Sequence, residues 1–229
     1  MWNLFTSPDK RRQQALDKAT SPVMREFLGK PFADKQTDWR EAEIVSLDFE
    51  TTGLDPSKDQ IISLGLVIMQ HGAIQLGTAW HEILRVDQPV PESSAVIHRI
   101  TDDQTLSGRP LQEVLPELLE ILSGRVMLVH FGRIEQGFLN AACQQLYGSP
   151  FLLPTIDTLV LAERIYSRSN PSINPHRLRL FNLREDYNLP RYQAHNALND
   201  ALSTAELFMV MAYEIMPLGP ASLKNFINA

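Results

Sequence analysis

The sequence contains little cysteine and no long uninterrupted hydrophobic run. Its 229 residues include one cysteine, Cys143, which has neither the partner that a disulfide needs nor the paired spacing of a structural zinc site. No window reaches the roughly 18 uncharged apolar residues of a membrane span, and the N-terminus lacks the apolar core of a secretory signal. We therefore expect a cytoplasmic protein in which Cys143 is a small buried hydrophobic residue.

An excess of positive charge is also missing. Lysine and arginine total 21 against 27 aspartate and glutamate residues, which leaves a formal net charge of -6. This balance excludes a protein that coats nucleic acid through bulk positive charge, but it permits a small local site. Basic residues gather between Arg164 and Arg191, where they form either a solvated helix face or a surface that contacts phosphate.

The length fits one globular domain with a small extension. Residues 1–42 are polar, and Ser7-Pro8 and Ser21-Pro22 are typical helix starts, with the second helix ending at Gly29. We expect a helical N-terminal arm over residues 1–42, a main domain over 43–217 and a short C-terminal tail over 218–229.

The main domain begins with strands and continues with alternating helices and strands. Apolar runs predict an antiparallel meander with strands over 44–49, 61–69 and 73–83. A short buried strand is expected over 126–129. Apolar residues at helical spacing and turn signals predict helices over 110–122, 134–146, 156–166 and 196–216. This order indicates an α/β fold in which helices pack against a mixed sheet.

Two acids, Asp48 and Glu50, interrupt the otherwise buried strand "IVSLDFETTGL". Side chains at i and i+2 of a strand share a face and lie roughly 7 Å apart at the backbone. Two carboxylates 4 Å apart repel by about 4 kcal/mol at an effective dielectric of 20, unless a proton or cation intervenes. Magnesium and manganese prefer such oxygen ligands, and two ions about 3.5–4 Å apart can clamp a phosphodiester. Taken alone, the pair is more typical of the end of an ordinary solvated strand than of a metal site.

Two further segments favour a metal site. "TTG", Thr51 to Gly53, predicts a tight turn whose backbone N–H groups face a nucleotide. "QAHNALNDALSTAELF" separates His195 and Asp200 by five residues, which would place them about 140° apart in a regular helix. We expect His195 in the loop before the last helix and Asp200 in its second turn, where the two side chains converge.

Taken together, these segments resemble the DEDDh group of 3′-to-5′ exonucleases. This DnaQ-like family includes the proofreading epsilon subunit of bacterial DNA polymerase III, ribonuclease T and oligoribonuclease. The resemblance covers about residues 43–215, and "LDFETTGL", "VHFGRIEQGFL" and "AHNALNDA" are similar to its three motifs. Weaker similarities are "VIHRITDD" and "IDTLVLA". The resemblance implies a ribonuclease H-like fold with a five-stranded mixed sheet flanked by helices.

The resemblance also implies a role for each motif residue. Two Mg²⁺ or Mn²⁺ ions are expected to bind to Asp48, Glu50, Glu135 and Asp200. His195 is expected to act as the general base, because imidazole exchanges protons near neutral pH. Candidate substrate contacts are Thr51, Thr52, Gly53, Leu54, His98, Ile100 and Phe138. For Leu54, Ile100 and Phe138, packing against the terminal bases competes with a simple role in the core. His130 is expected to make a structural hydrogen bond.

Glu135 departs from the family pattern, which has aspartate at this place. The extra methylene displaces the carboxylate by about 1 Å, and misplacement on that scale can cost about 10²-fold in rate. Three alternatives follow: a working variant with an adjusted metal geometry, a slow enzyme, or a binding module without useful turnover. Because the other acids and His195 are intact, we favour the first.

The sequence therefore predicts a metal-dependent 3′-to-5′ exonuclease that releases nucleoside 5′-monophosphates from single-stranded DNA ends. An exoribonuclease that trims RNA 3′ ends and a catalytically weak nucleic-acid-binding adaptor are the alternatives. The sequence does not reveal the 2′-hydroxyl contacts that would separate DNA from RNA. A polymerase or repair protein is the partner class that the resemblance suggests, and the oligomeric state stays open.

Overall fold

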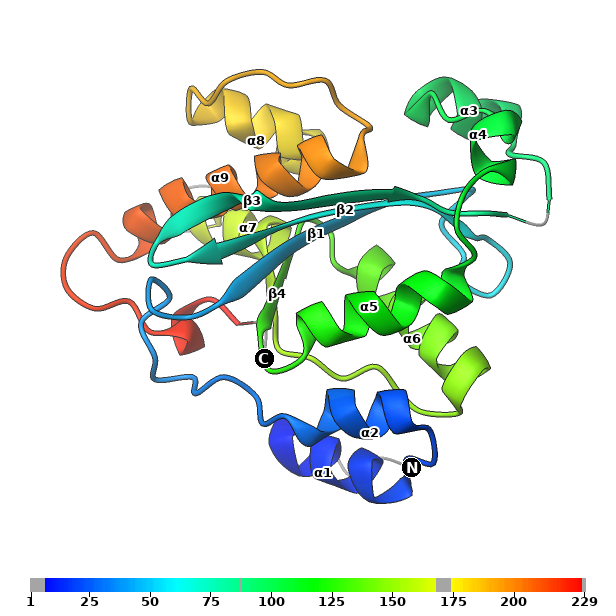
Figure 1. Cartoon of the computed structure of the whole chain (residues 1–229). Coiled ribbons are helices and arrows are strands. Elements are labelled where there is room, and N and C mark those ends of the chain that lie inside the picture. Colours follow the sequence, from blue (N-terminus) through cyan, green and yellow to red (C-terminus); the bar gives the residue numbers. More distant parts are fainter. Residues whose placement is uncertain (1–6, 87, 168–173, 228–229) are drawn as a thin grey trace.

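A five-stranded mixed sheet forms the centre of the structure, a computed structural model that describes residues 7–86, 88–167 and 174–227 (Figure 1). The strand order is β3-β2-β1-β4-β5. Strands β1 to β3 are antiparallel, whereas β4 runs parallel to β1 and β5 runs parallel to β4. The strands are β1 (Ile44–Thr51), β2 (Ile61–Gln70), β3 (Ala73–Ile83), β4 (Val126–Val129) and β5 (Thr155–Asp157). This confirms the expected α/β fold with a five-stranded mixed sheet.

Helices cover both faces of the sheet (Figure 1). In the described residues they are α1 (Pro8–Lys18), α2 (Pro22–Gly29), α3 (Glu92–His98), α4 (Asp102–Leu106), α5 (Leu111–Leu122), α6 (Arg133–Tyr147), α7 (Thr158–Tyr166), α8 (Leu180–Asp186) and α9 (Ala197–Ile215). One hydrophobic cluster joins β1 and β2 to α5 and α6, and a second joins the sheet to α7, α8 and α9. Helices α3 and α4 lie at the end of the sheet where β1 finishes (Figure 1).

The N-terminal arm packs against the α5–α6 side of the sheet. Ser7 caps α1, and α2 ends at Gly29 as expected. Phe27 of α2 stacks on Phe151 with ring centroids 5.4 Å apart, and both belong to the same hydrophobic cluster as the central strands. The expected domain boundaries at residues 42 and 217 stay a prediction.

The helix expected over 156–166 begins two residues later than the sequence indicated, at Thr158. Thr155–Asp157 forms the fifth strand, which is only three residues long and follows Pro154, so no periodicity distinguishes it from a helix start. Helices α3, α4 and α8 are also additions to the predicted elements. Each is seven residues or shorter, too short for a helical repeat to be recognised.

Two expectations drawn from composition can be compared with the structure. Among the residues that the structure describes, no helix is long and apolar enough to cross a membrane. Cys143 is buried in α6, as predicted, and burial raises the pKa of its thiol to about 12.

A glycine in β2 allows the last helix to begin directly against the sheet. Gly65 lies opposite Asp48 in the β1–β2 register. A Cβ at Gly65 would lie 2.1 Å from the backbone nitrogen of Leu198 and 2.2 Å from the carbonyl carbon of Ala197. The Ser46 hydroxyl donates a hydrogen bond of 2.7 Å to the Ala201 carbonyl oxygen. Together these contacts hold the first turns of α9 against β1 and β2.

We expect Gly65→Ala to lower the free energy of unfolding by about 1–3 kcal/mol, because the new methyl group forces α9 away from the sheet. Urea-induced unfolding measures this change. Gly77→Ala in β3 is the matched control, since a Cβ there meets nothing within 4 Å. Equal effects of the two substitutions would contradict the close approach of α9.

Candidate active site

Three carboxylates from two distant segments converge at the end of β1. Asp48 and Glu50 project from β1, and Asp200 comes from the first turn of α9. One oxygen of each carboxylate lies within 4.8 Å of an oxygen of the others. Asp200 was expected in the second turn of the last helix and lies in the first turn instead. Its side chain nevertheless converges with Asp48 and Glu50, as expected.

Glu135 approaches the same place from the first turn of α6. Strand β4 pairs only with Ile44 to Ser46, so the later part of β1 has no strand on that side. Glu135 is 2% exposed, and the backbone amides of Glu135 itself and of Phe49 oppose the rise in the pKa of its carboxyl that burial causes. In the described residues it is not part of the group within 4.8 Å, yet its charge acts on Asp48.

Burial and mutual repulsion raise the pKa values of Asp48, Asp200 and Glu135. Loss of solvation is the largest cause at each of them. For Asp48, the charges of Glu135, Asp200 and Glu50 add to it and raise the pKa well above its usual range. The pKa of Asp200 rises to about 7, although the His195 backbone N–H donates to its Oδ2 at 3.1 Å and opposes the rise. For Glu135 the pKa rises to about 8.

The donor atoms of this cluster suit a hard divalent cation. Glu50 Oε1, Glu135 Oε2 and Asp200 Oδ1 are buried and have no hydrogen-bond partner in the part of the chain that the structure describes, whereas buried polar atoms are normally paired. Magnesium or manganese would satisfy several of these oxygens and remove the repulsion between them. The residues present therefore fit the metal ions that the sequence predicts, with Asp48, Glu50, Glu135 and Asp200 as the available ligands.

Two histidines lie beside the carboxylates. His195 precedes α9, in the loop where it was expected, and its backbone is left-handed with φ of 62°. His98 ends α3, and its Nδ1 contacts Glu50 Oε2. The two rings meet edge to face with centroids 5.9 Å apart, and Glu50, His98 and His195 each offer a ligand atom within 4.8 Å of the others. His98 was expected to contact the terminal nucleotide of a substrate. In the structure it contacts the carboxylate of Glu50 directly.

Arg184 anchors the loop that carries His195. It is 1% exposed and donates hydrogen bonds to the carbonyl oxygens of Ser203 and Pro190, at 2.7 and 2.8 Å. It also pairs with Glu206 at 2.7 Å and lies over the Tyr192 ring, 4.9 Å from its centroid. This arginine belongs to the basic stretch between Arg164 and Arg191, but it is a buried structural residue and forms neither a solvated face nor a phosphate contact.

The turn after β1 is held by its own side chains. Thr51 donates to the Gly53 carbonyl oxygen at 2.7 Å, and Thr52 donates to Asp59 Oδ1 at 3.2 Å. A Cβ on Gly53 would lie 2.4 Å from Asp59 Oδ2, so a larger residue here would displace the Asp59 carboxylate that binds Thr52. Leu54 projects from the turn and is 74% exposed. Leu54 is therefore accessible to a substrate, whereas the buried Thr51 is not.

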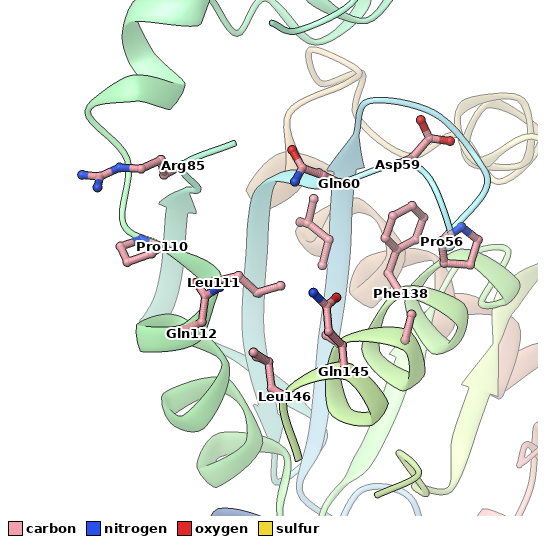
Figure 2. Close-up of a pocket in the computed structure, with 13 residues that line it drawn as sticks. Pro56, Asp59, Gln60, Arg85, Pro110, Leu111, Gln112, Phe138, Gln145 and Leu146 are labelled. Atoms are coloured by element: carbon pink, nitrogen blue, oxygen red, sulfur yellow. The ribbon is translucent and has the colours of Figure 1, made fainter. Parts of the chain in front are cut away.

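Ile100 and Phe138 are both buried. Ile100 is 7% exposed and packs with Ile62, Val86 and Val90. Phe138 is 4% exposed and belongs to the central hydrophobic cluster. It lines a pocket of about 170 Å³ between α5 and α6, where its ring lies near Pro56 (Figure 2). These positions give both residues a core role, and their contact with substrate stays a prediction.

The loop between β4 and α6 is fixed by Asp157 and His130. Asp157 accepts hydrogen bonds from the backbone amides of Phe131 at 3.0 Å and Gly132 at 2.8 Å, and it also caps α7. His130 Nδ1 lies 2.8 Å from Thr158 Oγ1, which confirms its expected structural hydrogen bond. Burial lowers the pKa of His130 to about 4. These contacts position the first turn of α6 and hence Glu135.

Three of the residues that position the site, Gly65, Asp157 and Arg184, had no role assigned to them from the sequence. Gly65 had a signal, because a glycine inside an apolar strand often marks close backbone approach. Asp157 also had one, since an acid before a helical run is a typical N-cap. Arg184 had none, because its partners come together only when the loop folds onto α9.

Known proteins show similarity over most of the chain. The exonuclease family RNase_T matches residues 45–208. The PolC-type DNA polymerase III of Thermotoga petrophila is 30% identical over 192 residues, which are 84% of this chain but 13% of that protein. The DNA polymerase III epsilon subunit of Treponema pallidum is 28% identical over 167 residues, 73% of this chain and 75% of that protein. The chain thus spans only a small part of the PolC-type relative.

A similar fold is found in a solved structure, the nuclease domain of 3′hExo, which is a DEDDh family member and was solved bound to rAMP. The TM-score is 0.67 at 18% identity, and the match covers 84% of this chain and 99% of that domain. At this identity the likeness concerns the fold, with its five-stranded sheet and flanking helices.

The raised pKa values predict how stability depends on pH. Between the ordinary pKa values of about 4 and the raised values of about 7 for Asp200 and about 8 for Glu135, the folded state binds more protons than the unfolded state. Without divalent metal, stability should therefore fall by on the order of a few kcal/mol as the pH rises through this window. Thermal unfolding in EDTA measures the fall.

Magnesium at about 100 times its dissociation constant should restore about 2.7 kcal/mol at pH 8. Asp200→Asn should flatten the pH dependence, whereas Asp17→Asn on the exposed face of α1 serves as a control. A stability that rises steadily from pH 5 to pH 8 in EDTA would contradict the buried-carboxylate cluster.

Proposed function

Since this chain belongs to the exonuclease family RNase_T, we propose that it is a DEDDh-type enzyme that removes nucleoside 5′-monophosphates one at a time from the 3′ end of single-stranded DNA. The observation that carries this proposal is the cluster of buried carboxylates with unpaired oxygens beside His98 and His195. Such a cluster is unfavourable in a merely structural role, because its charges repel in a poorly solvated place.

The acids provide the binding site for the metal ions. Asp48, Glu50, Glu135 and Asp200 would hold two divalent cations, which would supply Lewis acidity toward the phosphodiester. His98 contacts Glu50 and keeps its carboxylate oriented toward Asp48 and Asp200. The metal identity, magnesium or manganese, is part of the proposal.

His195 acts as the general base. It takes a proton from the attacking water, whose oxygen forms a bond to the phosphorus of the last linkage. The bond between phosphorus and the 3′ oxygen of the penultimate nucleotide breaks, and that oxygen leaves as a new 3′-hydroxyl end. The His195 backbone N–H is hydrogen-bonded to Asp200, so the base and a metal ligand keep one relative position.

The relatives support DNA as the substrate and leave RNA as the second candidate. The curated relatives are named as DNA polymerase III proteins, whereas the 3′hExo domain was solved with rAMP. By the same reasoning, a DNA polymerase is the proposed partner class. The third candidate, a weak or silent adaptor, rests only on glutamate in place of aspartate at position 135.

We expect release of nucleoside 5′-monophosphates from single-stranded DNA with a free 3′-hydroxyl, measured with Mg²⁺ and with Mn²⁺ in parallel with an RNA of the same sequence. EDTA should abolish it. His195→Ala should lower kcat by about 10²- to 10⁴-fold while calorimetric binding of Mn²⁺ changes little. His71→Ala, in the exposed β2–β3 turn, is the control. Undiminished release in excess EDTA would refute the metal-dependent mechanism.

Glu135→Asp tests the departure from the family pattern. The shorter side chain moves the carboxylate by about 1 Å, which can change the rate by about 10²-fold when ligand geometry matters. We expect a higher rate or an altered ratio of the rates with magnesium and manganese. Glu163→Asp on the exposed face of α7 is the control. If rate and metal preference both stay at wild-type values, Glu135 is not at the metals.

A further inference from the structure

Arg99 has a left-handed backbone at the edge of the candidate site. Its φ and ψ are 58° and 30°, and it caps α3 by donating its N–H to the Ala95 carbonyl oxygen at 2.8 Å. This conformation costs a residue with a side chain roughly 1 kcal/mol, and glycine is usual at such helix ends. The helix end itself therefore gives no reason for an arginine.

The two neighbours hold Arg99 in place. His98 contacts Glu50, and Ile100 is buried against Ile62, Val86 and Val90. With both sides anchored, Arg99 lines a pocket of about 190 Å³ together with Glu50, His98 and His195. The amide side chains of Gln104, Gln193 and Asn196 line the same pocket.

The guanidinium group of Arg99 has no partner among the residues that the structure describes. It is exposed and takes part in no ion pair or side-chain hydrogen bond there. Three further arginines, Arg85, Arg133 and Arg179, also make no ion pair or side-chain hydrogen bond within the described ranges, but they do not line this pocket. Most of the remaining arginines are paired. Ion pairs within the described ranges include those of Arg109, Arg125, Arg177, Arg184 and Arg191.

We propose that Arg99 binds a backbone phosphate of the substrate strand next to the scissile linkage. This inference rests on the proposed function, because it takes a nucleic-acid strand as the ligand. The chain has a net charge of -6, and the site itself contributes carboxylates, so an approaching polyanion needs a local positive group. A guanidinium can bind a phosphate through two parallel hydrogen bonds. Arg99 supplies this group within the pocket that contains His195.

The test is binding of a fluorescein-labelled, single-stranded oligothymidylate whose 3′-terminal linkages are hydrolysis-resistant phosphorothioates. Fluorescence anisotropy with Mg²⁺, over a series of NaCl concentrations, yields Kd and its salt dependence. Arg99→Gly should raise Kd by about 5- to 20-fold. It should also reduce the slope of log K against log salt by about 0.7, the value for one phosphate contact on a single strand.

Two variants separate phosphate binding from a purely structural role. Arg99→Lys keeps the positive charge and should keep the salt slope. His71→Gly removes a second left-handed side chain, φ 53°, in the β2–β3 turn, and should change neither Kd nor slope. The melting temperature of Arg99→Gly should equal or exceed that of the wild type, because glycine accepts this conformation freely.

An Arg99→Gly variant with wild-type Kd and salt slope would overturn the inference. A lower melting temperature together with weaker binding that Arg99→Lys does not restore would also overturn it. The outcome is independent of catalysis. If the wild type binds the strand through Arg99 but releases no nucleotides, the proposed function fails alone. If it releases nucleotides and Arg99→Gly binds as well as the wild type, only the Arg99 inference fails.

Discussion

Repulsion between buried carboxylates is the constraint on which the active-site architecture depends. Asp48, Glu50, Glu135 and Asp200 lie together where water cannot fully solvate their charges. Three of their oxygens receive no hydrogen bond from any residue that the structure describes. A structure can keep such a group together only if the surrounding packing is strong enough to oppose the repulsion. In the absence of cations, the preformed binding site therefore lowers the stability of the folded protein.

The groups that oppose this repulsion lie outside the motifs. Gly65 lets α9 start on the sheet and so places Asp200. Arg184 ties the preceding loop to α9 and so places His195. Asp157 holds the backbone before α6 and so places Glu135. Each acts through backbone geometry, and none needs to contact a substrate. The site is thus built from a short list of ligands and a separate set of residues that position them.

Glu135 shows how this support accommodates a longer side chain. The amides of its own residue and of Phe49 favour the charged form of its carboxylate, at a place where β1 has no neighbouring strand on the β4 side. With its longer side chain, Glu135 still places its carboxylate close enough to Asp48 for the two charges to repel. A glutamate at this position is therefore compatible with a site that retains all four charges.

The sequence by itself determined the order of the long elements, the common face of Asp48 and Glu50, and the loop position of His195. These follow from local rules, namely the two-residue repeat of a strand and the chain spacing before a helix. Only the tertiary structure decided that Thr155–Asp157 is a strand, that Ile100 and Phe138 are buried, and that His98 touches Glu50. It also decided that Arg184 is buried while Arg99 is exposed in the pocket. Burial and partner choice depend on segments far apart in the chain, and no local pattern encodes those distances.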